Sequence, residues 1–220
     1  MKRLALIHTV DWYQKAITIP FFKPFLEKHP DLEIMNIMDD TLLSDSIRAG
    51  SATDEVLNRI VGYARLAQNA GADMVMCSCT TVNRAMEIAR ESGDFHIPAL
   101  NIDEPMAELA LQKGTHFGVV ATLHTSPQGT CYLLEREAKK AGKEIRIDVH
   151  VCPEAFEALM NNDVETHDRL VCELIDKIQD EVDVVVLGQI SLSQVKHTCS
   201  KPILQTGLLA VEAIEKILGL

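Results

Sequence analysis

The chain has 220 residues, 47% hydrophobic and 24% charged, which is enough to bury one large core or two smaller ones. Its formal net charge of −11 argues against nucleic acid or an anionic membrane surface as its main partner. No apolar run is long enough to cross a membrane, and the basic start runs into Asp11 too soon for a signal peptide. Six cysteines without a CxxC pair predict reduced thiols and a cytoplasmic location.

Short apolar segments alternate along the chain with segments that have helical periodicity. In chain order, we predict strands at residues 3–9, 32–40, 73–79, 97–103, 116–122, 144–151, 183–189 and 202–206. We predict helices at 56–71, 104–114 and 129–142, two more before Asp180, and one that closes the chain. This alternation is typical of parallel sheets covered by helices, so the predicted fold class is α/β.

The second half of the chain repeats landmarks of the first half in the same order. The strand "LALIHT" is answered by "FGVVAT", "DMVMCSC" by "DVVVLGQ", and "IPALN" by "KPILQ". Any α/β chain contains similar strands, but a fixed order favours duplication. We therefore predict two pseudo-symmetric lobes, residues 1–104 and 105–220, with the closing helix able to pack back on the first. Ligands of open α/β sheets bind at strand carboxyl ends, so the site is expected in the crevice between the lobes.

Four ordered motifs identify a family that the sequence resembles. They are Ser78-Cys79-Thr80-Thr81, "IPALNID" at 97–103, "GVVATLHT" at 118–125 with Tyr132 beyond it, and Leu187-Gly188-Gln189-Ile190. This set resembles the aspartate/glutamate/hydantoin racemase superfamily and covers nearly the whole chain. The resemblance implies two α/β lobes and a cofactor-independent isomerase that acts on a small anionic substrate.

The sequence departs from the family at one important position. The family's two-base racemases place a cysteine on each side of the reacting carbon, whereas this chain has Gln189 opposite Cys79. A glutamine amide cannot exchange a proton at neutral pH, so the symmetric two-thiol mechanism is not available. His8 and His124 follow the first strand of each lobe and are the candidates to replace the missing acid, although a lone histidine is more often structural.

Cys79 is the strongest candidate catalytic residue. A thiol between a strand and a helix is expected to lie where free backbone N–H groups stabilise the thiolate, and Thr80 and Thr81 add donors for a carboxylate. The alternative is a small buried hydrophobe, which is the interpretation we give to Cys77. The resemblance also implies substrate binding by Thr9, Thr122 and Thr125, for which strand-end capping is the simple alternative. Ser191 is a further predicted substrate-binding residue.

Other polar residues are interpreted as structural. We expect Asp39 and Asp40 to form a solvated turn at the mouth of the crevice, Asp103 to cap the following helix, and His167 to be an exposed helical residue. Segments 9–22, 40–50 and 152–165 are expected to be loops that set the pocket size.

Three functions remain open from the sequence. The first is a racemase-type isomerase with Cys79 as its acid/base group. The second is a decarboxylase or other lyase that needs one thiol, and the third is a binding protein for small carboxylates that has lost catalysis. No dinucleotide-binding or phosphate-binding glycine motif and no zinc-site spacing is present, so we expect neither a cofactor nor a metal. A symmetric homodimer is the expected assembly.

Overall fold

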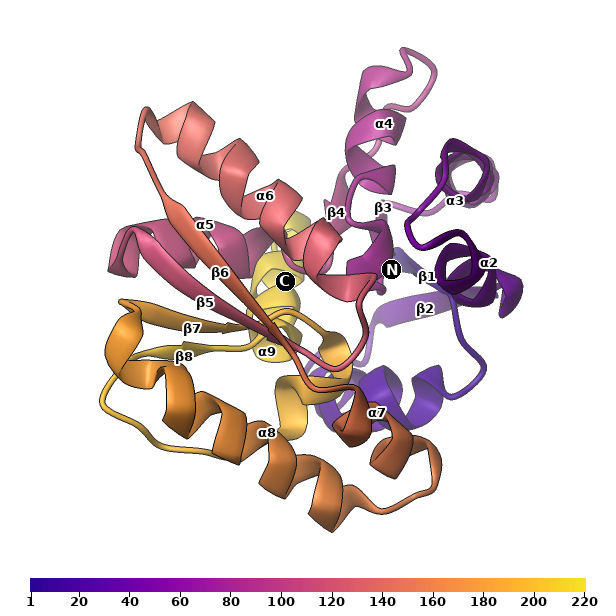
Figure 1. Cartoon of the computed structure of the whole chain (residues 1–220). Coiled ribbons are helices and arrows are strands. Elements are labelled where there is room, and N and C mark those ends of the chain that lie inside the picture. Colours follow the sequence, from indigo (N-terminus) through magenta and orange to yellow (C-terminus); the bar gives the residue numbers. More distant parts are fainter.

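A computed structural model describes residues 1–220 and contains two four-stranded parallel sheets (Figure 1). The first has the order β2-β1-β3-β4, and the second the order β6-β5-β7-β8. The strands are β1 Lys2–His8, β2 Leu32–Met38, β3 Met74–Cys77, β4 Ala99–Asn101, β5 His116–Ala121, β6 Arg146–Val151, β7 Val184–Leu187 and β8 Ile203–Leu204. The identical order of strands in the two sheets confirms the predicted pair of pseudo-symmetric α/β lobes.

Helices flank both sheets (Figure 1). They are α1 Lys23–Lys28, α2 Thr41–Ala49, α3 Asp54–Asn69, α4 Ala85–Glu91, α5 Glu104–Lys113, α6 Ser126–Ala141, α7 Pro153–Met160, α8 Val164–Ile178 and α9 Thr206–Leu218. No helix combines the length and apolar character that crossing a bilayer requires.

The expectation that 9–22, 40–50 and 152–165 are loops was wrong. Residues Gln14–Phe22 form a π-helix, which continues into α1, α2 fills most of the second segment, and α7 fills most of the third. Helix α4 was also not predicted. Residues from all three of the expected segments nevertheless line the cavities described below.

The central strands are apolar because both of their faces are covered. All four residues of β3 are buried, as are all four of β7, which is usual for parallel strands between helix layers. In β1, alternate side chains enter different cores. Ile7 packs with Ile60 of α3 on one face, and Leu6 packs with Phe22 and Ile214 on the other.

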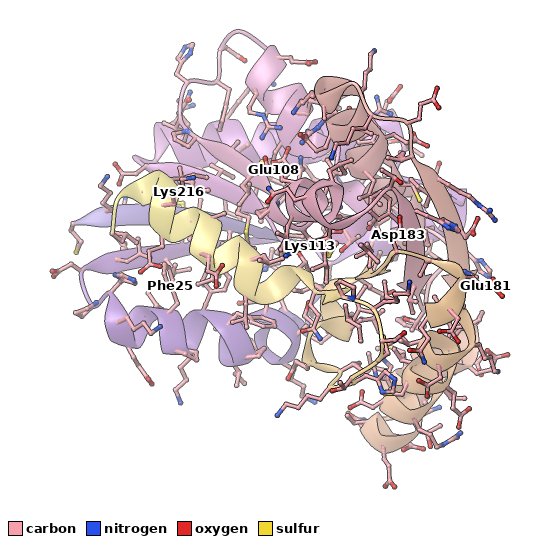
Figure 2. All side chains as sticks on the ribbon, turned by 90° about the vertical axis from the view of Figure 1, so that its left-hand side faces the viewer. Phe25, Glu108, Lys113, Glu181, Asp183 and Lys216 are labelled. Carbon is pink, nitrogen blue, oxygen red and sulfur yellow. The ribbon has the colours of Figure 1, made fainter.

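Each sheet packs against the helix that follows the last strand of the other sheet. Helix α9 follows the last strand of the second sheet, yet Ala210 and Ile214 belong to the core of the first lobe. In Figure 2, α9, with Lys216 labelled, lies along the first lobe on the side of Phe25. Conversely, α5 follows the last strand of the first sheet and places Met106 in the core around Phe117 of β5. This reciprocal packing ties the two sheets into one body around the crevice.

Candidate active site

A pocket lies at the carboxyl ends of the strands of both lobes. Cys79 follows β3 by two residues, and Gln189 follows β7 by two residues, so the duplication brings both to the same pocket. We call this space, of about 430 Å³ with part of it open to solvent, the inner pocket. Its lining residues are Thr9, Val10, Trp12, Ala16, Ile17, Leu43, Ser78, Cys79, Thr80, Thr81, Leu123, Ser126, Gln189 and Ile190.

Cys79 is half-buried, and its surroundings favour the protonated thiol. Burial raises the pKa of the Cys79 thiol, while hydrogen bonds from the Thr9 hydroxyl, from Thr81 and from the Val82 N–H act against this shift. The expectation of a thiolate stabilised by a helix terminus was therefore wrong. The helical segment after Cys79 is a single 3₁₀ turn, Thr80–Val82, whose few N–H groups do not outweigh the desolvation of the charged sulfur.

Gln189 is held firmly on the opposite side by its own lobe. Its Oε1 accepts hydrogen bonds from the N–H and the hydroxyl of Thr122, each at 3.1 Å. Its Nε2 donates to the hydroxyl of Ser191 at 2.9 Å. Thr122 therefore lies behind Gln189 and does not line the inner pocket. The side-chain amide of Gln189 presents a fixed, uncharged surface to the inner pocket.

The hydroxyl groups of the pocket join the two lobes. Thr81 Oγ1 of the first lobe lies 3.3 Å from Ser126 Oγ, the first residue of α6 in the second. The hydroxyl of Thr125, one residue earlier, is buried without a hydrogen-bond partner and does not cap α6. The amino end of a 16-residue helix thus reaches the pocket with an uncapped first turn, which is a favourable place for an anion.

Helix α6 and the Cys79 segment are in very close contact. A Cβ atom built on Gly129 of α6 would lie 2.0 Å from the carbonyl oxygen of Thr80. Only glycine allows this approach. The position of α6 therefore determines the position of the residue next to Cys79.

Asp103 is the buried centre of this contact, not the capping side chain that the sequence suggested. Its carboxylate is fully buried and caps no helical N–H group. It accepts hydrogen bonds from Asn83 at 2.9 Å, from Thr130 of α6 at 3.0 Å and from Thr80 at 3.4 Å. Burial raises the pKa of Asp103, and these donors oppose the shift. Asp103 thus links the segment after Cys79 to α6 through hydrogen bonds with both.

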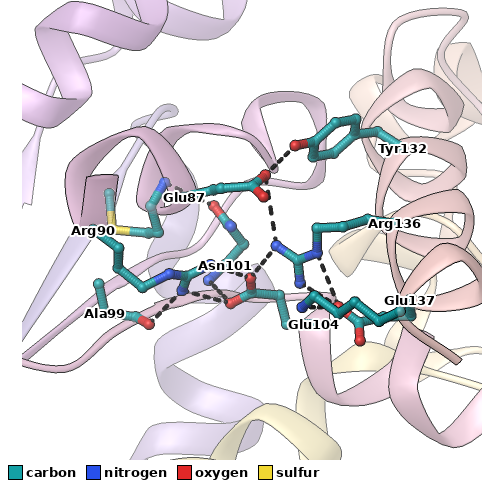
Figure 3. A network of polar contacts seen from close by, with 10 residues as sticks. Glu87, Arg90, Ala99, Asn101, Glu104, Tyr132, Arg136 and Glu137 are labelled. Carbon is teal, nitrogen blue, oxygen red and sulfur yellow. Dashed lines mark hydrogen bonds and ion pairs between the residues drawn. The ribbon is translucent and has the colours of Figure 1, made fainter. Parts of the chain in front are cut away.

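A network of ion pairs joins the lobes beside this contact (Figure 3). Glu104, which is 4% exposed, pairs with Arg90 of α4 at 2.6 Å and with Arg136 of α6 at 2.7 Å. Burial alone would raise the pKa of Glu104, but the two guanidinium groups lower it below its usual value. Tyr132 of α6 donates a hydrogen bond to Glu87 of α4. Ion pairs and a hydrogen bond therefore hold α4 of the first lobe and α6 of the second lobe together next to the pocket.

Neither of the predicted catalytic histidines lies in the inner pocket. His8 is fully buried behind it, stacked on Tyr13 with ring centroids 3.9 Å apart and bonded to Ser78 and Asn36. Burial lowers the pKa of His8 to about 4, so it is neutral at physiological pH. His124 is exposed and lines no described cavity. The sequence placed both correctly at strand ends but could not show which way the chain turns afterwards.

Three further residues differ from expectation. Asp39 is not in a solvated turn, because it bonds to Arg59 and to the Tyr63 hydroxyl of α3. His167 is 1% exposed, so the prediction of an exposed residue was wrong. Ser191 lines a second cavity next to the inner pocket. Cys77 is buried in the core as expected, and no cluster of three or more His, Cys, Asp or Glu residues in the chain is arranged to hold a metal ion.

Sequence reasoning missed Ser126 and Trp12. Ser126 could have been found, because Pro127 favours the first turn of a helix and would have moved the predicted start of α6 from 129 to 126. Trp12 precedes a π-helix with Pro20 inside it, for which the sequence carries no reliable pattern.

The fold and the pocket define a class of protein: two duplicated α/β lobes with parallel sheets that hold one thiol in the pocket between them. Within this class, the chain belongs to the Asp/Glu/Hydantoin racemase family, because the model of that family matches residues 24–214.

Solved structures share the fold. Aspartate racemase from Picrophilus torridus matches with a TM-score of 0.72 and 14% identity, covering 100% of this chain and 95% of its own. Glutamate racemase from Francisella tularensis matches with a TM-score of 0.70 and 15% identity, covering 99% and 81%. A variant of arylmalonate decarboxylase matches with a TM-score of 0.64 and 16% identity, covering 99% and 93%. No curated protein sequence matches this chain significantly.

Proposed function

We propose that this protein is a cofactor-independent isomerase of the racemase type, which transfers a proton at the carbon next to the carboxylate of a small, amino-acid-like acid. One observation carries the proposal: Cys79 is the only titratable side chain that lines the inner pocket. Proton transfer at carbon needs a positioned acid or base within reach, and Cys79 is the group available for it. Membership in the racemase family supports the reaction class.

The substrate carboxylate binds at the amino end of α6. The lining offers the hydroxyls of Thr80, Thr81 and Ser126, together with N–H groups of an uncapped first helical turn. No lysine, arginine or histidine lines the inner pocket, so hydroxyl and backbone dipoles provide the anion site. Leu123 and Ile190 add apolar contacts for the rest of the substrate.

In this reaction Cys79 removes the proton as a thiolate. Its raised pKa means that the thiolate is scarce at neutral pH, so the rate increases with pH until the thiol is deprotonated. The same hydrogen bonds that oppose the shift, from Thr9, Thr81 and Val82, stabilise the thiolate when it forms. Gln189 offers an amide N–H to the developing enolate, and the proton for its face of the carbon comes from water, because that side has no titratable group.

A single experiment in D₂O tests the proposal. Racemic and single-enantiomer small acids are incubated with the protein, and proton NMR follows the signal of the hydrogen at Cα while a chiral column follows inversion. Exchange of that hydrogen together with inversion is the expected result. If no acid of a broad panel exchanges, the proposal is wrong.

The second candidate is a lyase that uses the thiol as an acid, and a specific observation favours it. The inner pocket holds one thiol with a raised pKa and no partner base, which suits delivery of a proton better than its removal. In a decarboxylation, the bond from Cα to the leaving carboxyl group breaks, carbon dioxide departs, and the electron pair left on carbon takes the proton of Cys79. Water then restores the thiol.

The two candidates have opposite pH dependence. The isomerase needs the thiolate, so its kcat/KM increases above neutral pH. The lyase needs the thiol, so its kcat/KM is level through neutral pH and decreases above the pKa of Cys79. Release of carbon dioxide identifies the lyase directly. A cytoplasmic location and a symmetric homodimer stay predictions, the latter to be tested by light scattering.

A further inference from the structure

A second and larger cavity adjoins the inner pocket. We call it the outer chamber; it encloses about 1160 Å³, part of it open to solvent. Trp12 and Ala16 line both cavities, so the two spaces share a wall. Ser191 lines the outer chamber and accepts a hydrogen bond from Gln189, which lines the inner pocket. A substrate with its carboxylate in the inner pocket therefore has the outer chamber beside it.

One residue of the chamber wall has a buried polar atom that no other group in the protein satisfies. His167 of α8 lines the chamber and is 1% exposed. Its Nδ1 lies 2.7 Å from Asp168 Oδ1, whereas its Nε2 is buried without any hydrogen-bond partner. A buried polar atom without a partner costs free energy, and native proteins keep few of them. A ligand that bonds to Nε2 accounts for this one.

The chemistry of His167 indicates what the ligand must offer. The Asp168 carboxylate can only accept a hydrogen bond, so Nδ1 of His167 carries the proton that it donates. With a single proton on the ring, Nε2 is an acceptor. Its partner must be a donor, such as a hydroxyl or an amide N–H.

Apolar side chains in the wall of the chamber indicate that an alkyl chain connects this donor to the rest of the ligand. Met160, at the end of α7, and Val164, at the start of α8, are 44% and 55% exposed and both line the chamber. Asn162 between them has φ 60°, the left-handed conformation that turns α7 into α8. Asp163 then caps α8 by accepting the Thr166 N–H at 3.1 Å. This tight turn presents an apolar surface, suited to an alkyl chain, next to His167.

We infer that the outer chamber is the subsite for the substrate's substituent, an alkyl chain that ends in a hydroxyl or amide donor hydrogen-bonded to Nε2 of His167. The inference rests on the proposed function, because it assumes that the carboxylate end binds beside Cys79. His167 is on this view a specificity-determining residue. It has no part in the proton transfer itself.

Protection of Cys79 against alkylation tests the inference without knowledge of the substrate. The protein is treated with iodoacetamide in the presence of unbranched carboxylic acids of three to six carbons or their ω-hydroxy counterparts, and mass spectrometry measures alkylation of the Cys79 peptide. At the best chain length, we expect the ω-hydroxy acid to protect at about a tenfold lower concentration than the unsubstituted acid, as one hydrogen bond to an otherwise unpaired buried acceptor allows. The advantage is expected to vanish in His167→Leu and to persist in His96→Leu, a matched change at an exposed histidine outside both cavities.

A measurement on the unmodified protein covers the case in which His167→Leu does not fold. The ¹⁵N chemical shift of the unprotonated Nε2 of His167 should move when the ω-hydroxy acid binds and should stay in place with the unsubstituted acid. Equal protection by both acids, or an unchanged Nε2 shift, would overturn the inference and leave the proposed function intact. Protection by neither acid would overturn the proposed function.

Discussion

Replacing Gly129 with alanine tests whether α6 positions the Cys79 segment. Gly129 is in the first turns of α6, where a Cβ would lie 2.0 Å from the Thr80 carbonyl oxygen and 3.2 Å from Cβ of Asn83. Gly62 provides the control, because it lies inside α3 and a Cβ there would meet nothing within 4 Å. The two substitutions are chemically identical and differ only in what surrounds the new methyl group.

The expected energies have opposite signs. In an open helix interior, glycine to alanine stabilises by roughly 0.5–1 kcal/mol, so Gly62→Ala should raise the free energy of unfolding by that amount. Gly129→Ala gains the same helical preference, but overpacking typically costs about 1–3 kcal/mol. Here the contact is with backbone, and reaching the 3.0 Å that real Cβ atoms tolerate means a shift of about 1 Å. We expect a net loss of about 1–2 kcal/mol.

The shift also reaches the pocket. A displacement of about 1 Å next to a reacting group can cost about a hundredfold in rate, so Gly129→Ala should lose activity well beyond its loss of stability. Urea unfolding curves give the stabilities, and turnover, or the alkylation rate of Cys79, reports on the pocket. The reasoning is refuted if Gly129→Ala is as stable and as active as Gly62→Ala.

Three further changes probe the groups around the pocket. Because burial lowers the pKa of His8 from 6.5 to about 4, its contribution to stability is complete above pH 6.5 and is lost as the pH falls towards 4, a difference of about 3 kcal/mol. Urea unfolding at pH 7 and pH 4.5 should show this loss in the parent and much less of it in His8→Phe. Asp103→Ala removes the carboxylate that accepts hydrogen bonds from Thr80, Asn83 and Thr130, and leaves these buried donors without a partner. Thermal unfolding should therefore show that the free energy of unfolding falls by about 3 kcal/mol or more. Gln189→Ala removes one donor to the enolate, and kcat should decrease about 10²–10³-fold with little change in binding.

The repeated strands made the fold predictable. Apolar segments of strand length recur in the same order in each half, and parallel strands covered on both sides must be apolar throughout. The short helix α2 escaped prediction because its nine residues carry only three large apolar side chains, Leu42, Leu43 and Ile47, although their spacing is helical. His167, in contrast, could have been placed correctly. It lies four residues before Val171 and eight before Ile175, on the buried face of α8.

The properties of the site depended on contacts that sequence does not show. Cys79 and Gln189 could be placed in one pocket because the duplication relates them. The raised pKa of Cys79 could not be predicted, since the burial that causes it comes from packing around the assembled pocket. Asp103 stands next to the start of a helix, which is why the sequence suggests a cap. Its carboxylate instead bonds to Asn83, 20 residues earlier in the chain, and to Thr130, 27 residues later.

The most direct test of the central claim compares hydrogen exchange at Cα in the parent protein and in Cys79→Ser. The acid that the parent exchanges fastest in D₂O is given to both proteins, and binding is measured separately by calorimetry. A serine hydroxyl is a far weaker acid than a thiol, so exchange should be nearly abolished while binding survives through Thr80, Thr81 and Ser126. Exchange by Cys79→Ser at the rate of the parent would contradict the account.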